Sequence, residues 1–381
     1  MEQLSSNRPT LSLIDLDALT FNFRSVKRFV GQEVKYMAVV KADCYGHGAV
    51  ECSRRLSAEG VDWFGVALPE EGVELRDAGI REPILCLGSF WPGQQDTLIS
   101  RRLTPVIVDG EQAELFDRAA AAAGTSAAYH VKIDTGMGRI GMRHDAAAGF
   151  ARELSRFRNI RLDGLMTHFA AADDTSENAF TLRQIDRFEA AVRIFRDHGF
   201  DPIFLDLANS PGAIAHPRSG GNMVRLGGVL YGLGGDVLPK DIIKPELKPV
   251  LSLRTQISHL KSVPAGESLG YGRSFTTNKE SLIATIPVGY ADGFPRALSN
   301  NGRVIVNGEF APIVGRVSMD WTIIDVTDVP RVGIGDEAIL IGSSGDLRIE
   351  AEEIAAAVGT ISYEITCGIK GRVPRQVVNN G

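Results

Sequence analysis

The residue best suited to chemistry is Lys41, which ends the apolar run MAVV at residues 37–40 and precedes the stretch ADCYGHG. Burial at the end of a strand removes hydration from an ammonium group, so the pKa of such a lysine falls. A neutral lysine amine is a nucleophile that forms Schiff bases with carbonyl compounds. A buried salt bridge is the alternative role for this lysine, and the segment alone does not decide between the two.

Other groups that transfer protons or bind anions fall near the ends of further apolar runs. Each alone has a structural explanation, such as an ion pair or a capped turn. If the runs are the parallel strands of a barrel, however, their carboxyl ends meet at one mouth. The shared pattern therefore predicts a site there, built from Lys41, Lys132, Asp134, Arg139, His168, Asn209, Ser210, Arg225, Gly227 and Gly228.

The elements that would position these groups are apolar, β-branched runs that mostly alternate with helical segments. Their continuous apolar character is typical of parallel strands buried on both faces. Helices are expected at 111–124 and 184–199, each ending in a glycine. The pattern predicts a (βα)8 barrel, with a doubly wound open sheet as the alternative. The runs lie at 35–42, 62–68, 83–88, 104–109, 129–135, 162–169, 204–209 and 223–232.

The pattern changes after about residue 245, where apolar runs follow one another without long helices. Asn307-Gly308 between two such runs predicts a hairpin, and only 347–359 looks helical. We therefore expect a barrel domain at residues 1–245 and a mainly β domain at 246–381. A ninth candidate strand at 11–18 would either cap the barrel or join the second domain.

The chain carries no P-loop motif. Barrel phosphate sites are usually built from the loops after strands seven and eight together with a helix N-terminus. Ser210-Pro211-Gly212 and Leu226-Gly227-Gly228 occupy those places, with Ser210 as the expected helix N-cap and Pro211 as the first helical residue. Ordinary capping and tight turns explain each motif alone.

Composition excludes several classes of protein. The 381 residues carry a net charge of -6 and no basic cluster, which argues against a nucleic-acid partner. No apolar run is long enough to span a membrane, and the N-terminus lacks a signal pattern. The four cysteines have no CxxC spacing, so we expect free thiols in a reducing cytoplasm and no metal site.

Nine ordered motifs resemble the alanine racemase family from RPTLSLIDLDAL near the N-terminus to RVPR near the C-terminus. The resemblance implies a pyridoxal phosphate-binding barrel, a β domain and a homodimer whose subunits share each active site. The motifs are VVKADCYGHG, KIDTGMGRIGMR, THFA, ANS, MVRLGG, GYGRSF, VGYADGFPR, GRVSMD and TISYEITCGIKGRVPR.

The resemblance also implies roles for individual residues. Lys41 would hold the cofactor as a Schiff base and act as one catalytic base, and Tyr271 of the partner subunit would act as the other. Arg225 would face the pyridine nitrogen, and Arg139 would contact the phenolic oxygen of the cofactor and the substrate. His168 would lie beside the ring and link Tyr271 to Arg225.

The remaining roles fall into three groups. Met319 would contact the substrate carboxylate from the second subunit, and Lys132 matches a lysine that is often carbamylated in this family. Tyr290, Asp320 and Tyr363 would line the access to the site. The other cofactor-binding residues, mainly around the phosphate, would be Tyr45, Asn209, Ser210, Gly227, Gly228 and Tyr363.

Plain structural roles remain open for several of these residues. Tyr271 and Met319 could simply pack, Tyr45 could be an aromatic residue at the barrel rim, and Asp320 could cap a turn. The chain also departs from the family at Asp206, where histidine is common. A carboxylate there would either orient Arg225 through a charge-assisted hydrogen bond or form a plain ion pair.

The implied activity is the interconversion of L- and D-alanine, which supplies D-alanine for peptidoglycan. A serine or broad-specificity racemase is the nearest alternative, although Tyr363 favours a small substrate. An amino-acid decarboxylase of the same architecture would place an acid where Arg225 lies. A non-catalytic carrier of pyridoxal phosphate would lack the β domain.

Overall fold

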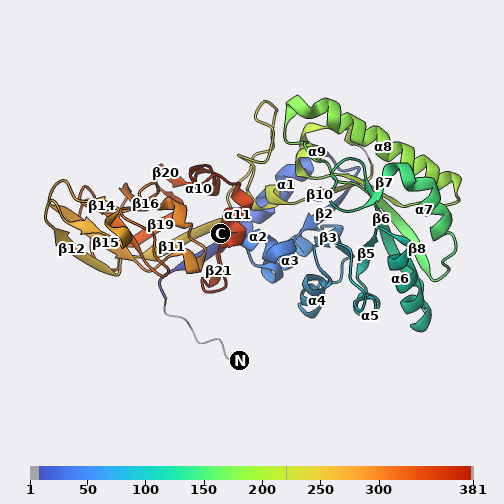
Figure 1. The fold of residues 1–381 in the computed structure, drawn as a ribbon, viewed down its shortest axis with the longest axis horizontal. Coiled ribbons are helices and arrows are strands. Elements are labelled where there is room, and N and C mark those ends of the chain that lie inside the picture. The colour runs from blue at the N-terminus through green and yellow to red at the C-terminus, as the bar shows by residue number, and fades with distance from the viewer. Residues whose placement is uncertain (1–7, 220, 379–381) are drawn as a thin grey trace.

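The computed structural model describes residues 8–219 and 221–378, so the ends of both predicted domains, at 1–7 and 379–381, lie outside the described residues. A ring of strands wrapped in helices forms one end of the molecule, and a second, mainly β part forms the other (Figure 1). None of the helices within the described ranges has the length and apolar character needed to cross a membrane.

The strands of the first domain form a closed parallel barrel. Each pairs with the next around the ring, and pairing of the first with the last completes it. Every predicted apolar run overlaps one of these strands, so the barrel prediction is confirmed and the open-sheet alternative is wrong. In ring order they are β5 (Thr104–Ile107), β4 (Ile84–Cys86), β3 (Trp63–Val66), β2 (Lys35–Val39), β10 (Met223–Leu226), β9 (Phe204–Ala208), β8 (Ile160–Met166) and β6 (Ala127–Asp134).

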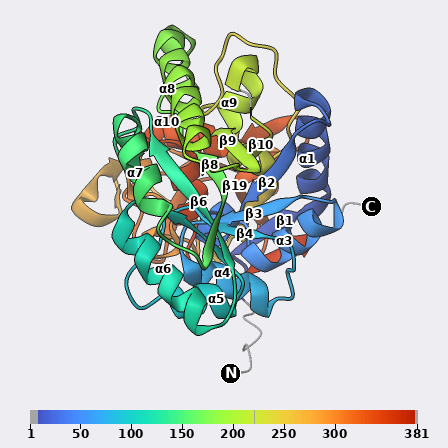
Figure 2. The same ribbon diagram turned by 90° about the vertical axis from the view of Figure 1, so that its right-hand side faces the viewer.

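Helices cover the outside of this ring, as the view in Figure 2 shows. The two predicted helices are present as α6 and α8, and the glycines beyond them, Gly124 and Gly199, have φ of +62° and +84°. Left-handed glycine is the common way to end a helix. The helices are α1 (Leu16–Val30), α3 (Ala49–Ala58), α4 (Pro69–Asp77), α5 (Gln95–Ser100), α6 (Gly110–Ala122), α7 (Ala147–Leu154), α8 (Asn178–Asp197) and α9 (Ser210–Ala215).

Large apolar side chains fill the inside of the ring, which is therefore a packed core and not a pore. Met37, Trp63, Met166 and Met223 belong to this buried cluster, and Phe204 packs against it. Side chains of a strand alternate between its two faces. Asp206 and Arg225 lie two residues beyond Phe204 and Met223, so they point into the barrel closer to its carboxyl end. The ion pair between them therefore lies toward that mouth.

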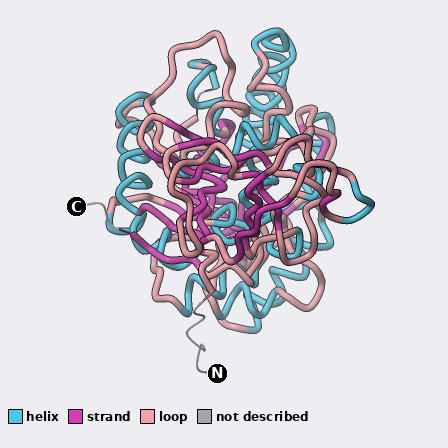
Figure 3. The backbone as a smooth tube through the Cα atoms, turned by 90° about the vertical axis from the view of Figure 1, so that its left-hand side faces the viewer, coloured by secondary structure: helices cyan, strands magenta, loops and turns pink. Residues whose placement is uncertain are grey.

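The second domain is mainly β, as predicted, and its strands gather at the centre of the view in Figure 3. Three sheets are described there. The first contains β17 (Glu309–Pro312), β16 (Arg303–Val306), β19 (Glu337–Ser344), β11 (Leu251–Gln256), β1 (Leu11–Asp15), β21 (Arg375–Val378) and β20 (Leu347–Ile349). The others are β12 (His259–Val263) with β15 (Ser281–Ile286) and β18 (Thr322–Asp325), and β13 (Ser268–Leu269) with β14 (Phe275–Thr276).

Two local predictions for this domain have different outcomes. The hairpin is confirmed, because Asn307 and Gly308 join β16 to β17 with φ of +48° and +79°, the signs that a type I′ turn requires. The expectation of a single helix is wrong. Besides α10 (Ala351–Val358), the chain forms α11 (Ser362–Gly368). Asp236 holds its first turn by accepting hydrogen bonds from the Ser362 backbone N–H at 2.6 Å and hydroxyl at 2.7 Å.

The first strand of the chain joins the second domain, which is one of the two alternatives for residues 11–18. Strand β1 pairs antiparallel with β11 and parallel with β21. It ends at Asp15, whose carboxylate accepts hydrogen bonds from the N–H groups of Asp17 and Ala18 and so caps α1. The chain thus crosses between the domains at its beginning as well as near residue 245, where the domain boundary stays a prediction.

Candidate active site

Lys41 opens a short segment, α2 (Lys41–Gly46), that is not an ordinary helix. The four residues Ala42–Tyr45 have φ between +52° and +54° and ψ between +35° and +50°, which is a left-handed turn without glycine. Such a conformation costs an L-residue roughly 1–2 kcal/mol, so surrounding contacts must hold it. Strained backbone of this kind clusters at functional sites.

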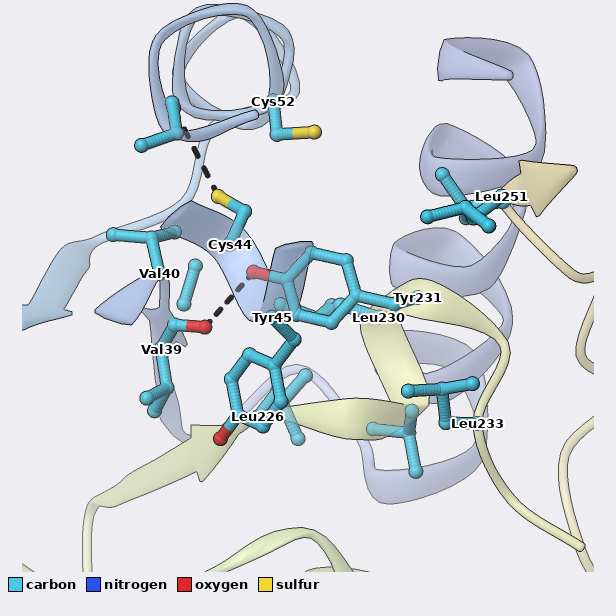
Figure 4. Close-up of a cluster of buried hydrophobic side chains, with 14 of the residues drawn as sticks. Val39, Val40, Cys44, Tyr45, Cys52, Leu226, Leu230, Tyr231, Leu233 and Leu251 are labelled. Atoms are coloured by element: carbon cyan, nitrogen blue, oxygen red, sulfur yellow. Dashed lines mark hydrogen bonds between the residues drawn. The ribbon is translucent and has the colours of Figure 1, made fainter. Parts of the chain in front are cut away.

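A buried wall of side chains supports this turn (Figure 4). The Tyr45 ring packs against those of Tyr231 and Tyr363, with centroids 5.2 Å and 5.1 Å away. The Tyr231 hydroxyl donates a 2.9 Å hydrogen bond to the carbonyl oxygen of Val39, the last residue of β2. Tyr45 is therefore anchored between the barrel and α11, and its hydroxyl is held close to the loop after β10.

The environment of Lys41 favours a neutral amine. Burial lowers the pKa of Lys41, and the nearby Arg139 and Arg225 lower it further, while Glu71 and the Cys367 thiol act in the opposite direction. No carboxylate of residues 8–219 or 221–378 forms an ion pair with Lys41. The salt-bridge alternative therefore has no support in the structure, and the nucleophile interpretation does.

Lys132 and His168 face the same group of cations. Lys132 is 5% exposed, and burial together with Arg225 and Arg139 lowers its pKa to about 8. Burial and the same positive groups lower the pKa of His168 to about 2, so this imidazole is neutral at physiological pH. Two lysines and two arginines thus converge on one mouth, a field that attracts a multiply charged anion.

Asp206 is the buried counter-charge to this cluster. Its carboxylate forms an ion pair with Arg225, and the two side chains are 0% and 3% exposed. Arg225 also donates a 2.8 Å hydrogen bond to the Thr167 carbonyl oxygen and approaches His168 Nδ1 at 3.2 Å. Burial raises the pKa of Asp206 to about 6 against the effect of Arg225. The predicted contact between Asp206 and Arg225 is present, and it fixes the plane of the guanidinium group.

The loops after β9 and β10 come together as predicted, with one correction. Asn209, not Ser210, is the N-cap of α9, because the Asn209 side-chain oxygen accepts a 3.0 Å hydrogen bond from the Gly212 N–H. Asparagine and serine are both good caps, so the sequence does not distinguish them. Ser210 is instead free to accept a 2.9 Å hydrogen bond from the Gly227 N–H, which ties the two loops together.

Gly227 and Gly228 form an open cradle beneath two tyrosine hydroxyls. A Cβ atom on Gly227 would lie 2.7 Å from the Tyr45 hydroxyl, and one on Gly228 would overlap the Tyr363 ring. Only glycine leaves this backbone accessible from the barrel mouth. With Ser210, these residues offer an anion short backbone and hydroxyl contacts.

Asp134 ends β6, and its carboxylate accepts hydrogen bonds from the N–H groups of Gly136 and Gly138 at 2.9 Å and 3.0 Å. The four predicted residues of the second domain lie on its surface. Tyr271 is 71% exposed, Met319 is 52% exposed, and Tyr290 is also exposed. The Tyr290 N–H donates to the Ser318 carbonyl oxygen at 3.0 Å, and the Asp320 carboxylate accepts a 2.7 Å hydrogen bond from Arg372. Strand β14, close to Tyr271 in sequence, lies at the end of the domain far from α2 (Figure 1). Among the described residues, no hydrogen bond or ion pair joins Tyr271, Tyr290, Met319 or Asp320 to Lys41.

Two residues that act on Lys41 were absent from the sequence prediction. Glu71 lies on α4, and Cys367 lies on α11, one helical turn after Tyr363. The spacing of Tyr363 and Cys367 places them on one face of a helix, but the sequence analysis expected no helix there. Glu71 follows a leucine N-cap, so the usual capping signature was missing as well.

Comparison with known proteins agrees with this geometry. The family model "Alanine racemase, N-terminal domain" matches residues 14–234, and "Alanine racemase, C-terminal domain" matches residues 250–377. The chain is 46% identical over 373 residues to the alanine racemase of Halothermothrix orenii, covering 98% of this chain and 97% of that protein.

Solved structures show the same similarity. Alanine racemase from Clostridium difficile 630 superposes with a TM-score of 0.91 at 37% identity, covering 98% of this chain and 96% of that one. The Bartonella henselae alanine racemase with covalently bound pyridoxal phosphate superposes with a TM-score of 0.87 at 28% identity, covering 97% and 99% of the two chains.

Proposed function

The chain belongs to the alanine racemase family of pyridoxal phosphate-dependent isomerases, and we propose which of its residues interconvert L- and D-alanine. Lys41 and Tyr271 of the partner subunit are the two bases, and Arg225, Arg139 and His168 surround the cofactor ring. The observation that supports this proposal best is the desolvated Lys41 amine among cations at the barrel mouth.

The residues at this mouth fit pyridoxal phosphate. The cofactor carries a doubly charged phosphate and an aldehyde. Arg225 and Arg139, with Asp206 as the buried counter-charge, match the charge. The closely approachable backbone of Gly227 and Gly228, with the Ser210 hydroxyl hydrogen-bonded to the Gly227 N–H, would suit a phosphate. A neutral Lys41 amine matches the aldehyde. When bound, the cofactor withdraws electrons from the substrate α-carbon and makes its proton acidic.

Racemisation needs a proton to leave one face of the α-carbon and another to arrive on the opposite face. Lys41 stands at the barrel mouth on one side and holds or releases a proton at Nζ. The Tyr271 hydroxyl of the partner subunit performs the same task on the other side. His168, which contacts Arg225 at 3.2 Å, would also orient the hydroxyl of that tyrosine.

A homodimer would complete the site, since Tyr271, Met319 and Tyr290 are exposed on the second domain. Large apolar side chains exposed together are typical of surfaces that bind another protein. A two-fold axis would bring each of these surfaces to the barrel mouth of the other subunit. Tyr290, Asp320 and Tyr363 would then border the access to the site.

Arg225 suits racemisation better than the competing decarboxylase function. A guanidinium group keeps its proton, so Arg225 would leave a pyridine nitrogen that it faced unprotonated. This role of Arg225 would limit electron withdrawal by the cofactor and so disfavour transamination as a side reaction. Asp206 strengthens this arrangement by holding the guanidinium group in place.

Carbamylation of Lys132 is part of the same proposal. A lysine with a pKa of about 8 has an appreciable neutral fraction at physiological pH, and only the neutral amine adds to carbon dioxide. The resulting anion would compensate the neighbouring cations and orient Arg139. The cytoplasmic location likewise stays a prediction, consistent with the four free cysteines.

Replacement of Gly228 by alanine is expected to weaken cofactor binding at least about tenfold, since the new methyl group displaces Tyr363 from the cradle. Titration of the full-length apoprotein with pyridoxal phosphate, followed by absorbance, gives the dissociation constant. Gly371→Ala is a matched control, because a Cβ there meets no atom within 4 Å. Equal affinities of the two variants would remove Gly228 from the phosphate site.

The proposed activity is tested with the purified protein and added pyridoxal phosphate. Circular dichroism should show loss of the optical activity of L-alanine, and of L-serine more slowly. Carbon dioxide release should be absent. Faster conversion of serine would favour the broad-specificity alternative, and carbon dioxide release without racemisation would contradict the proposal.

A further inference from the structure

Glu71, in the first turn of α4, reaches from its own helix to the segment that carries Lys41. One carboxylate oxygen accepts a 2.7 Å hydrogen bond from the backbone N–H of Ala42, the residue that follows Lys41. The other accepts hydrogen bonds from the N–H groups of Ala67 and Leu68 at 2.6 Å and 3.1 Å. One side chain thereby joins the loops that follow β2 and β3 at the barrel mouth.

Helix capping explains only part of this arrangement. Leu68 is the N-cap of α4 and Glu71 is its N3 residue, so the contacts to Ala67 and Leu68 are those of a usual capping glutamate. The contact to Ala42 adds nothing to α4. It satisfies the first N–H of the left-handed turn, whose conformation is unfavourable for L-residues.

With the Glu71–Ala42 contact, the backbone is held by hydrogen bonds on both sides of Lys41. Before it, the Val40 N–H donates a 2.8 Å hydrogen bond to the Gly65 carbonyl oxygen of β3. After it, Ala42 is held by Glu71. Hydrogen bonds to β3 and to the start of α4 therefore hold the backbone on both sides of Lys41. They fix the position of its Cα atom, from which the side chain extends.

Glu71 is moreover near enough to Lys41 for its negative charge to raise the pKa of the Lys41 amine. Its effect opposes burial and the two cations Arg139 and Arg225, and it has the same direction as that of the Cys367 thiol. Lys132, the buried lysine of the mouth, responds to Asp206. It and the partly buried Lys41 are thus affected by different acids.

We propose that Glu71 is a positioning residue for the reaction, which fixes the backbone beneath Lys41 and keeps a negative charge beside its amine. This inference rests on the proposed role of Lys41 as base and cofactor-holding residue. Glu71 touches neither substrate nor cofactor in this proposal and acts through Lys41 alone.

The test measures the amine directly. Full-length protein stripped of cofactor is labelled with fluorodinitrobenzene across a pH series, and the Lys41 peptide is quantified by mass spectrometry. In Glu71→Gln the midpoint of Lys41 labelling should fall by about one pH unit, because the charge that favours the ammonium form is gone. If Glu71 only stabilised the fold, a loosened turn would expose Lys41 and move the midpoint upward. An upward shift or an unchanged midpoint overturns the proposal.

Two further variants keep the result interpretable. Glu70→Gln changes the neighbouring glutamate, which is exposed and accepts a hydrogen bond from Gln94, and it should leave the midpoint unchanged. Glu71→Asp keeps the charge but is too short to hold Ala42. It should retain the wild-type midpoint while kcat of the holoenzyme falls about tenfold at unchanged KM. Wild-type kcat in Glu71→Asp would contradict the positioning role.

Failure of this inference is distinguishable from failure of the proposed function. If the pH midpoint of Lys41 labelling is unchanged in Glu71→Gln, the proposed role of Lys41 is not affected. An active Lys41→Ala enzyme would instead remove the premise, whatever the effect of Glu71 on the amine.

Discussion

Replacement of Lys41 by alanine is expected to abolish racemisation, with kcat lowered by at least about 10⁴-fold. This single change removes both the amine that holds the cofactor and one of the two groups that transfer a proton. Burial and the neighbouring cations lower the pKa of this amine and so make it reactive. We expect no other lysine side chain to take its place. The rate is measured as loss of L-alanine optical activity with cofactor in excess.

Lys261→Ala provides the control for this prediction, since Lys261 is exposed on β12 in the second domain. It should retain wild-type activity. The cations and cradle that remain in Lys41→Ala should still bind the cofactor without a covalent link. More than about one hundredth of wild-type activity in Lys41→Ala would mean that another residue carries the proton, because a general base contributes at least that much.

Tyr271→Phe is expected to lose at least about 10³-fold in kcat while retaining bound cofactor and the wild-type melting temperature. Only the hydroxyl group is removed, and Tyr271 is 71% exposed in its own chain. The substitution should therefore change the stability of the fold little. Proton abstraction from L-alanine should suffer most, which exchange of the α-proton with deuterated solvent can measure for each enantiomer. Full activity in this variant would remove Tyr271 from the mechanism.

Mixing the two inactive variants tests whether the subunits share the site. A mixed dimer combines the intact Lys41 of one subunit with the intact Tyr271 of the other at one of its two sites. Random reassociation should therefore restore about a quarter of wild-type activity. Dimers that stay inactive after proven subunit exchange would indicate that each chain completes its own site.

Much of the barrel could be predicted from the sequence because its signals are local. Continuous apolar runs indicate parallel strands. Because the carboxyl ends of these strands meet at one end of the barrel, the polar residues there lie together. Asp206 and Arg225 are adjacent for the same reason, since β9 and β10 pair and both side chains point inward. The hairpin at Asn307-Gly308 follows from a two-residue signal that tertiary contacts do not override.

The features that escaped prediction depend on contacts between distant segments. Ala42–Tyr45 contain no glycine, so no local rule indicates a left-handed turn there. Helix α11 begins where Asp236, 126 residues earlier, satisfies its first N–H. The Glu71 contact joins loops 29 residues apart. Local sequence propensity does not predict these contacts. The features that it fails to predict lie near Lys41.

Reduction of the holoenzyme with borohydride, followed by digestion and peptide mass mapping, tests the central claim most directly. The account predicts a pyridoxyl adduct on the peptide that contains Lys41 and on no other peptide. An adduct on Lys132 instead, or an unmodified Lys41 peptide from protein saturated with pyridoxal phosphate, would contradict it.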